Sequence, residues 1–79
     1  IQTKRVTFKT NQNVNIKNND LESLQIIYNL ENEICVKFEK KKVSFQELID
    51  LIKKNGTKIQ DISTDDGDLE DVFIRLTKN

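Results

Sequence analysis

The sequence contains no histidine and a single cysteine, Cys35. One cysteine cannot close an internal disulfide, so a reducing compartment is the expected setting. A catalytic or metal-binding thiol needs a histidine, a second cysteine or a cation arrangement beside it, and the first two are absent from the whole sequence. Because alternation places Cys35 on the polar face of its strand, we expect ordinary packing or partial exposure there.

Net charge and long apolar runs are also missing. Thirteen Lys and Arg residues balance thirteen Asp and Glu residues, which gives no net attraction to nucleic acid or anionic lipid. No apolar run approaches the ~20 residues that span a bilayer, and no signal peptide is recognisable. A Walker A loop, a Ser-His-Asp set and paired catalytic carboxylates are absent, and the two glycines have turn roles. We therefore predict a domain that is not itself an enzyme and holds no metal or cofactor.

The composition that remains is typical of a small folded domain. Hydrophobic residues make up 35% and charged residues 33% of the 79 positions, with regular apolar periodicity, so residues 1–79 are predicted to form one domain. A chain of this length buries only about 60% of the surface that it exposes when unfolded, so its stability should be small. The sequence lacks methionine and begins with Ile1-Gln2-Thr3, and we interpret it as a piece of a longer chain.

The clearest local pattern predicts a helix that begins after Ser44. Ser44 and Glu47 form an S-x-x-E capping box, and Val43 with Leu48 forms the hydrophobic staple around it. Gly56 supplies the left-handed residue that ends the helix. The predicted buried stripe is Phe45, Leu48, Ile49 and Ile52.

Alternation of apolar and polar residues predicts a half-buried strand over residues 4–10, with Val6 and Phe8 on one face. Residues 57–63 should form the last strand. Ile59 and Ile62 are three positions apart, so a bulge or an early exit from the sheet is needed to reconcile them. A turn over residues 64–67 should follow.

A hairpin is predicted between these strands, with residues 25–30 and 33–40 joined at Glu31-Asn32. Its matching faces are Ile26, Tyr28 and Leu30 on one strand and Ile34, Val36 and Phe38 on the other. Residues 11–19 read as a loop or a short strand, followed by a short helical turn over residues 21–24 that Asn19 or Asp20 could cap.

The last dozen residues predict a second amphipathic helix. Asp68 is placed to cap it, and Asp71 lies at the capping-box position and can pair with Arg75. The apolar stripe, at spacing i, i+3, i+4 and i+7, is Leu69, Val72, Phe73 and Leu76. The order of elements predicts an α+β fold of the ferredoxin-like split βαβ pattern. It has a four-stranded antiparallel sheet with helices on one face, plus an extra C-terminal helix.

Three groups of residues have a functional and an ordinary interpretation. The acidic cluster, which comprises Asp65, Asp66, Asp68, Glu70 and Asp71, lacks the spacing of a calcium loop and is more typical of a turn and a helix start. Residues 40–42 are three lysines that could touch phosphate or an anionic membrane, although a solvated turn is the commoner meaning. Tyr28 and Phe38 could stack on RNA bases, but with five aromatic residues in the chain we expect both in the core.

The tail also carries a resemblance. Ile59-Gln60-Asp61-Ile62-Ser63, running into Leu69-Glu70-Asp71-Val72-Phe73-Ile74-Arg75-Leu76-Thr77, resembles the end of bacterial exporter-type ABC transporter ATP-binding subunits. Those proteins close with a Leu-Glu-Asp-x-Phe-x-x-Leu-Thr helix in a small domain after the nucleotide-binding domain. The resemblance covers residues 57–77. A Pro-Ser-like pair usually precedes that helix, whereas Gly67-Asp68 stands here, and Ser and Asp are interchangeable caps.

The resemblance implies an accessory or regulatory domain of an ABC transporter, with ATP and Mg bound in an upstream domain. Its implied partners are its own nucleotide-binding domain, a second ATPase subunit in a homodimer, or the membrane permease subunit, and no nucleic acid. It would be cytoplasmic, peripheral to the inner face of the cell membrane through the transporter complex. The candidate docking residues are Leu69, Glu70, Asp71, Val72, Phe73, Ile74 and Leu76. The alternatives are a small-ligand or ion-sensing regulatory domain of ferredoxin-like fold and, less favoured by the neutral charge, an RNA-binding module.

Overall fold

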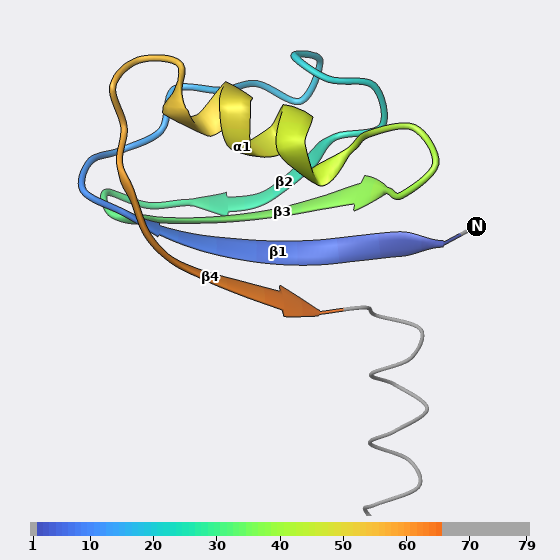
Figure 1. Ribbon diagram of the computed structural model, residues 1–79, viewed down its shortest axis with the longest axis horizontal. Helices are drawn as coiled ribbons and strands as arrows, with labels where there is room; N and C mark the ends of the chain where they lie inside the picture. Colours follow the sequence, from blue (N-terminus) through green and yellow to red (C-terminus); the bar gives the residue numbers. More distant parts are fainter. Residues whose placement is uncertain (1, 66–79) are drawn as a thin grey trace, which may run out of the picture.

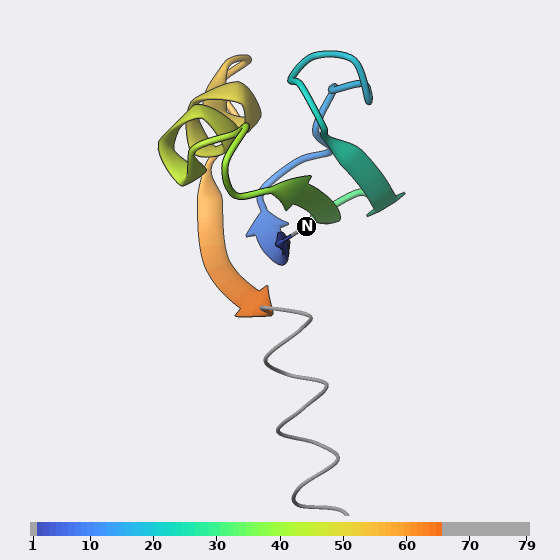
Figure 2. The same ribbon diagram turned by 90° about the vertical axis from the view of Figure 1, so that its right-hand side faces the viewer.

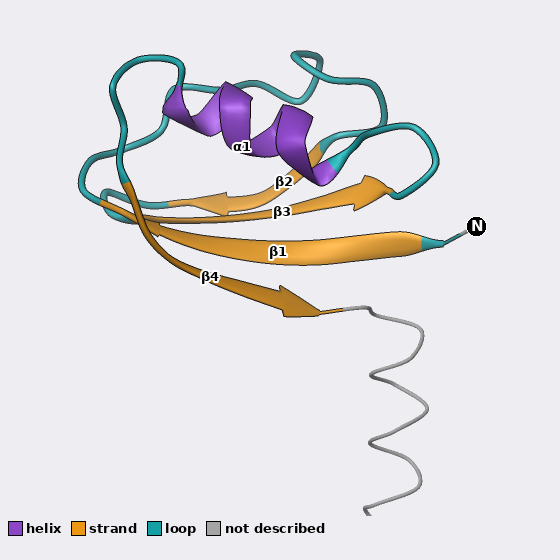
Figure 3. Cartoon of the chain, viewed as in Figure 1, coloured by secondary structure: helices purple, strands orange, loops and turns teal. Residues whose placement is uncertain are grey.

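A computed structural model describes residues 2–65 of the chain. Four antiparallel strands form one sheet, and a helix and a long connecting segment lie over one of its faces (Figure 1). Figure 3 distinguishes the strands and the helix from the connections by colour. The elements are β1 (Thr3–Thr10), β2 (Gln25–Asn29), β3 (Glu33–Glu39), α1 (Phe45–Lys53) and β4 (Ile59–Asp65), and the strand order is β2-β3-β1-β4. The predicted α+β class with a four-stranded antiparallel sheet is confirmed.

The two central strands, β1 and β3, carry the middle of the core. Val6 pairs with Val36 and Phe8 pairs with Ile34 across them, and each of these four residues is 0% exposed. Successive side chains of a strand point to opposite faces, so the same four residues define the face on which the helix packs. The predicted inner face of the first strand is confirmed.

Helix α1 begins and ends where its sequence predicts. The Ser44 hydroxyl accepts from the Glu47 amide at 3.1 Å, and the Glu47 carboxylate accepts from the Ser44 amide at 3.1 Å, which completes the capping box. Gly56 has φ +82° just after the helix, in the left-handed region that favours glycine. Of the predicted stripe, Leu48 and Ile52 are fully buried, and Phe45 and Ile49 are half-buried.

The connection between β1 and β2 is an irregular loop, residues 11–24, of which Val14, Ile16 and Leu24 are buried. Of the two alternatives for residues 11–19, a loop or a short strand, the loop is observed. Its apolar residues nevertheless belong to the core, with Val14 2% exposed, Ile16 8% and Leu24 5%. These side chains cover the sheet as a helix would.

The predicted helical turn over residues 21–24 is wrong. The Leu24 amide donates to the Leu21 carbonyl at 3.3 Å, which closes a single turn, but Ser23 has φ +65° and interrupts any helix there. The Asp20 carboxylate accepts from the Lys17 amide at 2.8 Å, so it closes a preceding turn instead of capping a helix.

The hairpin of β2 and β3 is confirmed, but its predicted face is wrong for two residues. Ile26 pairs with Val36 on the core side as expected. The register then shifts, so Tyr28 pairs with Cys35 on the opposite face, and Leu30 is 56% exposed. Cys35, expected on the polar face, is on that face but only 3% exposed.

Strand β4 contains the predicted bulge. Lys9 pairs with Asp61 and Thr10 with Ile59, so the register shifts by the extra residue Gln60. This brings Ile59 onto the same face as Ile62, as their spacing required. The strand continues through Asp65, so the predicted turn is wrong for residues 64 and 65. The remainder of that turn, the predicted C-terminal helix and the acidic cluster beyond Asp65 lie outside the described residues.

Candidate functional site

The seven predicted docking residues, from Leu69 to Leu76, lie outside the described residues, so the site is built from the surface beside β4, the last described strand, which ends at Asp65. Figure 2 shows α1 and the loop of residues 11–24 side by side above the sheet. The helix-side face therefore has a β2–β3 half under the loop and a β1–β4 half beside the helix. The two halves are covered to different extents.

Asparagine side chains fasten the loop over the β2 half. Asn18 Oδ1 accepts from the Ile26 amide at 2.9 Å, and Asn29 Nδ2 donates to the Val14 carbonyl at 2.7 Å. Asn13 Nδ2 donates to the carbonyl of Leu30 at 2.8 Å. These asparagines thus satisfy backbone groups of β2, of the loop and of Leu30, along a strand that pairs only with β3 among residues 2–65.

Phe8 is the buried ring at the centre of the β1–β4 half, where α1 and β4 meet. The Phe45 ring stacks on it with centroids 6.2 Å apart and an interplanar angle of 20°, and Ile62 is its cross-strand partner on β4. Ile49 lies one helical turn after Phe45, on the same side of α1. Ile62 is 38% exposed, whereas Phe45 and Ile49 are half-buried. We name these three residues the α1–β4 margin.

A cation borders the α1–β4 margin. Lys4 Nζ lies 5.7 Å from the centroid of the Phe45 ring, a cation–π geometry that keeps a positive charge beside the apolar surface. The adjoining strand β4 is exposed from Gln60 to Thr64. Within the described residues β4 pairs only with β1, and the Ile62 amide is met by the Asp61 carboxylate at 2.9 Å.

The helix-free face of the sheet is polar and electrically balanced. The charged residues in register form two rows, one of Glu33, Lys9 and Asp61 and one of Lys37, Arg5 and Asp65, with the uncharged row of Cys35, Thr7 and Ser63 between them. Equal numbers of cations and anions in these rows give neither sign a continuous patch. An antiparallel sheet commonly leaves one face in water. The balanced charges of this face fit that role and do not form a binding site for a charged ligand.

Tyr28 is the aromatic residue of this face. Its hydroxyl donates to Glu33 Oε2 at 2.5 Å. That hydrogen bond is the main reason that the pKa of Tyr28 is raised above its ordinary value of 10.0, and partial removal of the side chain from water is the second. Phe38 instead lies in the core at 2% exposure, so the two aromatics that could have stacked on RNA bases do not share a face.

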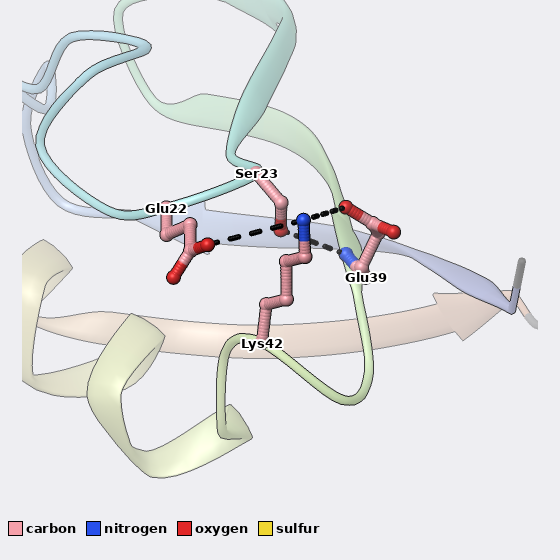
Figure 4. Close-up of polar contacts among 4 residues, drawn as sticks. All are labelled: Glu22, Ser23, Glu39 and Lys42. Carbon is pink, nitrogen blue, oxygen red and sulfur yellow. Dashed lines mark hydrogen bonds and ion pairs between the residues drawn. The ribbon is translucent and has the colours of Figure 1, made fainter.

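Lys42 joins the loop to the end of β3 (Figure 4). Its Nζ lies 3.4 Å from Glu39 Oε2 and 3.8 Å from Glu22 Oε1, and Ser23 Oγ accepts from the Glu39 amide at 3.1 Å. An open groove of about 500 Å³ lies beside this cluster, lined by Gln2, Glu39, Lys41 and Lys42. Because Lys42 is engaged by two carboxylates, the geometry favours a structural tie over an anion site.

Metal and membrane features can be stated for the described part of the chain. Across residues 2–65, no three Cys, Asp or Glu side chains gather as ligands for one ion. None of the helical structure in the same range has the length and apolar character needed to traverse a bilayer.

Sequence reasoning did not predict the α1–β4 margin, although the spacing of Ile59 and Ile62 in β4 was an indication of it. The three-residue spacing of Ile59 and Ile62 required a bulge, and the bulge is what turns Ile62 toward the helix side. How far α1 extends over β4 depends on helix docking, which no local pattern encodes.

Comparisons with known proteins identify no relative. No family model matches the chain, no curated protein matches it, and no solved structure matches it. The functional assignment therefore rests on the residues themselves.

Proposed function

We propose that the chain is a non-catalytic accessory domain of the ATP-binding subunit of a bacterial exporter-type ABC transporter. The observation that carries this proposal is the residue order of the tail, Leu69-Glu70-Asp71-Val72-Phe73-Ile74-Arg75-Leu76-Thr77. ATP and Mg bind to an upstream nucleotide-binding domain. The accessory domain, residues 1–79, supplies contacts with partner domains or subunits during ATP-driven export. It works at the inner face of the cell membrane through the transporter complex.

The tail helix has two working sides in this proposal. Its apolar stripe, which includes Phe73, packs on the domain, while Ile74 lies about 100° further round the helix and faces outward. An exposed isoleucine beside a packed stripe gives a partner an apolar contact. The partner is the domain's own ATPase domain, a second ATPase subunit or the membrane permease subunit.

The finer fold in this proposal is the ferredoxin-like split βαβ pattern with a C-terminal helix. The order β2-β3-β1-β4 with antiparallel pairing supports it, because β3 separates β1 from β2 and β1 separates β3 from β4. Helix α1 makes the second crossover. The loop of residues 11–24 takes the place of a helix in the first.

The substitution Ile74→Asp tests the transporter assignment. In the full subunit it should leave the domain folded and weaken assembly with the ATPase domain or the membrane subunit, because a carboxylate replaces an apolar contact. Ile74→Leu is the matched control and should assemble normally. Unchanged assembly and ATPase rate in Ile74→Asp, or an upstream reading frame without a P-loop motif, would contradict the proposal.

A small-ligand or ion-sensing domain is the second candidate, and a shallow groove favours it. This groove of about 270 Å³ is lined by Thr3, Ser23, Gln25, Lys37, Phe38 and Glu39. Titration with divalent ions and with nucleotides, followed by amide shifts in NMR spectra, distinguishes the two functions. Saturable shifts confined to Ser23 and Lys37 would support sensing, and unchanged spectra would reject it.

A further inference from the structure

A helix over residues 68–77 would be only marginally stable on its own in water. It contains ten residues and is about 15 Å long, whereas isolated helices shorter than about 12 residues are marginal even for favourable sequences. Its stability must therefore come from packing its apolar stripe. The stripe consists of Leu69, Val72, Phe73 and Leu76.

The α1–β4 margin lies at β4, the strand that ends at Asp65. Ile62 on β4 and Phe45 on α1 flank the same core ring, Phe8, from two sides. The margin is apolar, partly exposed and open along β4, whose residues from Gln60 to Thr64 are exposed. It can accept one more apolar layer without displacing any side chain of the core.

The length of the chain allows the tail to reach this margin. Strand β4 ends at Asp65, and Ile62 lies three residues earlier, about 10 Å back along the strand. If residues 66–68 reverse the chain, a helix that runs back over β4 from Asp68 carries Phe73 about 7.5 Å along its axis, close to the level of Ile62. Lys4 at the border of the margin and Glu70 beside the stripe also have opposite charges.

The remaining exposed large apolar residues of the described chain are further away. Ile27 and Leu30 belong to the β2 side, and three inter-strand spacings, about 14 Å, separate β2 from β4. Leu69 follows Asp65 by four residues, so the margin, which lies at the edge formed by β4 itself, is the nearer of the two surfaces.

We infer that residues 68–77 fold back as a helix and bury their apolar stripe on the α1–β4 margin of the same molecule. Phe73 then covers Ile62 and Phe45, and Ile74 remains on the outer surface. The docked helix completes the helix-side layer next to α1 and fixes the orientation of Ile74. This inference rests on the C-terminal helix of the proposed fold and not on the transporter assignment.

A double-mutant cycle in the 79-residue chain tests the docking. Ile62→Ala and Phe73→Ala are made singly and together, and urea unfolding is measured for each. If the side chains touch, the effect of Phe73→Ala on the unfolding constant should differ by more than about threefold between the parent and Ile62→Ala backgrounds. Ile27→Ala is the matched control, since Ile27 is 42% exposed on the other edge, and it should be additive with Phe73→Ala.

The other outcomes separate the possible failures. Additivity within about threefold, together with helical carbon shifts for residues 68–77, overturns the docking and leaves the proposed helix intact. Additivity with non-helical shifts overturns both. A coupling that appears only as protein concentration rises overturns docking within one molecule and assigns the tail to a second copy.

A second readout covers the case in which an alanine variant unfolds. Phe73→Leu removes the aromatic ring and keeps an apolar side chain of similar size. The NMR shifts of the Ile62 methyl groups should then move while those of Ile27 stay, because ring-current effects act over short distances. Unmoved Ile62 methyl shifts in the folded variant would overturn the inference.

Discussion

The two edges of the sheet are finished in different ways. At β2, asparagine side chains join the strand to the preceding loop: Asn18 of the loop accepts from the Ile26 amide, and Asn29 of β2 donates to the Val14 carbonyl of the loop. At β4, residues 60–64 are exposed, and within the described chain the Ile62 amide is met by its neighbour Asp61. The first edge is completed by residues that precede it. The second is where the chain continues, and we assign its completion to the residues that follow.

The two halves of the helix-side layer repeat this contrast. Loop residues 11–24 have no helix, yet Val14 and Leu24 are at most 5% exposed, close to Leu48 and Ile52 of α1 at 0% and 1%. The α1–β4 margin has a regular capped helix, yet Ile62 remains 38% exposed. Coverage of a sheet therefore depends on which apolar side chains reach it, and regular secondary structure is not required.

The largest loss of unfolding free energy is expected at a buried isoleucine of the helix-side face, compared with an exposed isoleucine of the same face. Ile34→Ala should cost about 2–5 kcal/mol of unfolding free energy, because Ile34 is 0% exposed and leaves a cavity. With the tail prevented from docking by Phe73→Ala, Ile62→Ala should cost less than half as much, since Ile62 is 38% exposed in the described structure. Urea unfolding of both variants measures the difference. Equal costs would show that the two halves are equally covered.

The loop side should show an intermediate effect. Asn18→Ala removes the acceptor of the Ile26 amide and should cost about 1 kcal/mol, with faster hydrogen exchange at that amide. Asn18→Asp keeps an acceptor oxygen and is the matched control. If both variants exchange as slowly as the parent, the asparagine does not protect the β2 edge.

The Lys42 ion pairs between the loop and β3 should contribute less to the unfolding free energy. Lys42→Ala breaks two partly exposed ion pairs and should change the unfolding free energy by about 0–1 kcal/mol. The neighbouring Lys41→Ala serves as the control for removing a lysine from the same turn. A loss well above 1 kcal/mol would show that the loop is held mainly by charge and not by its apolar residues.

The last prediction concerns Tyr28 on the helix-free face and how the stability of the domain depends on pH. Because its pKa is raised in the folded state, the protonated Tyr28 contributes stability that is complete below pH 10.0 and is lost as the pH rises through the folded value. Tyr28→Phe should remove this loss at high pH. Tyr28 is the one tyrosine of the chain, so its ultraviolet titration in the folded protein should have a midpoint above 10.0. A midpoint at or below that value would contradict the hydrogen bond to Glu33.

Local signals account for what could be predicted. Ser44 and Glu47 carry the whole capping box within four residues, and Val6 with Phe8 fixes the inner face of β1 by alternation alone. Ile59 and Ile62 indicated the bulge in β4 because no regular strand places both on one face.

The remaining features depend on partners that are distant in the sequence. The register shift after Ile26 accompanies a hydrogen bond that the Ile26 amide donates to Asn18, eight positions earlier, and no residue pattern within β2 indicates it. Val14 and Ile16 looked too sparse to form a core element, but the loop brings both onto the sheet. The candidate margin was missed for the same reason, since Phe45 and Ile62 meet only through Phe8.

The most direct test of the unequal edges is a nuclear Overhauser measurement on the 79-residue chain with labelled isoleucine methyl groups. Docking of the tail predicts cross-peaks between the Ile62 methyl groups and the Phe73 ring, and none between Ile27 and that ring. Absence of the Ile62 cross-peaks in a folded sample, or their appearance only between differently labelled molecules, would contradict the account.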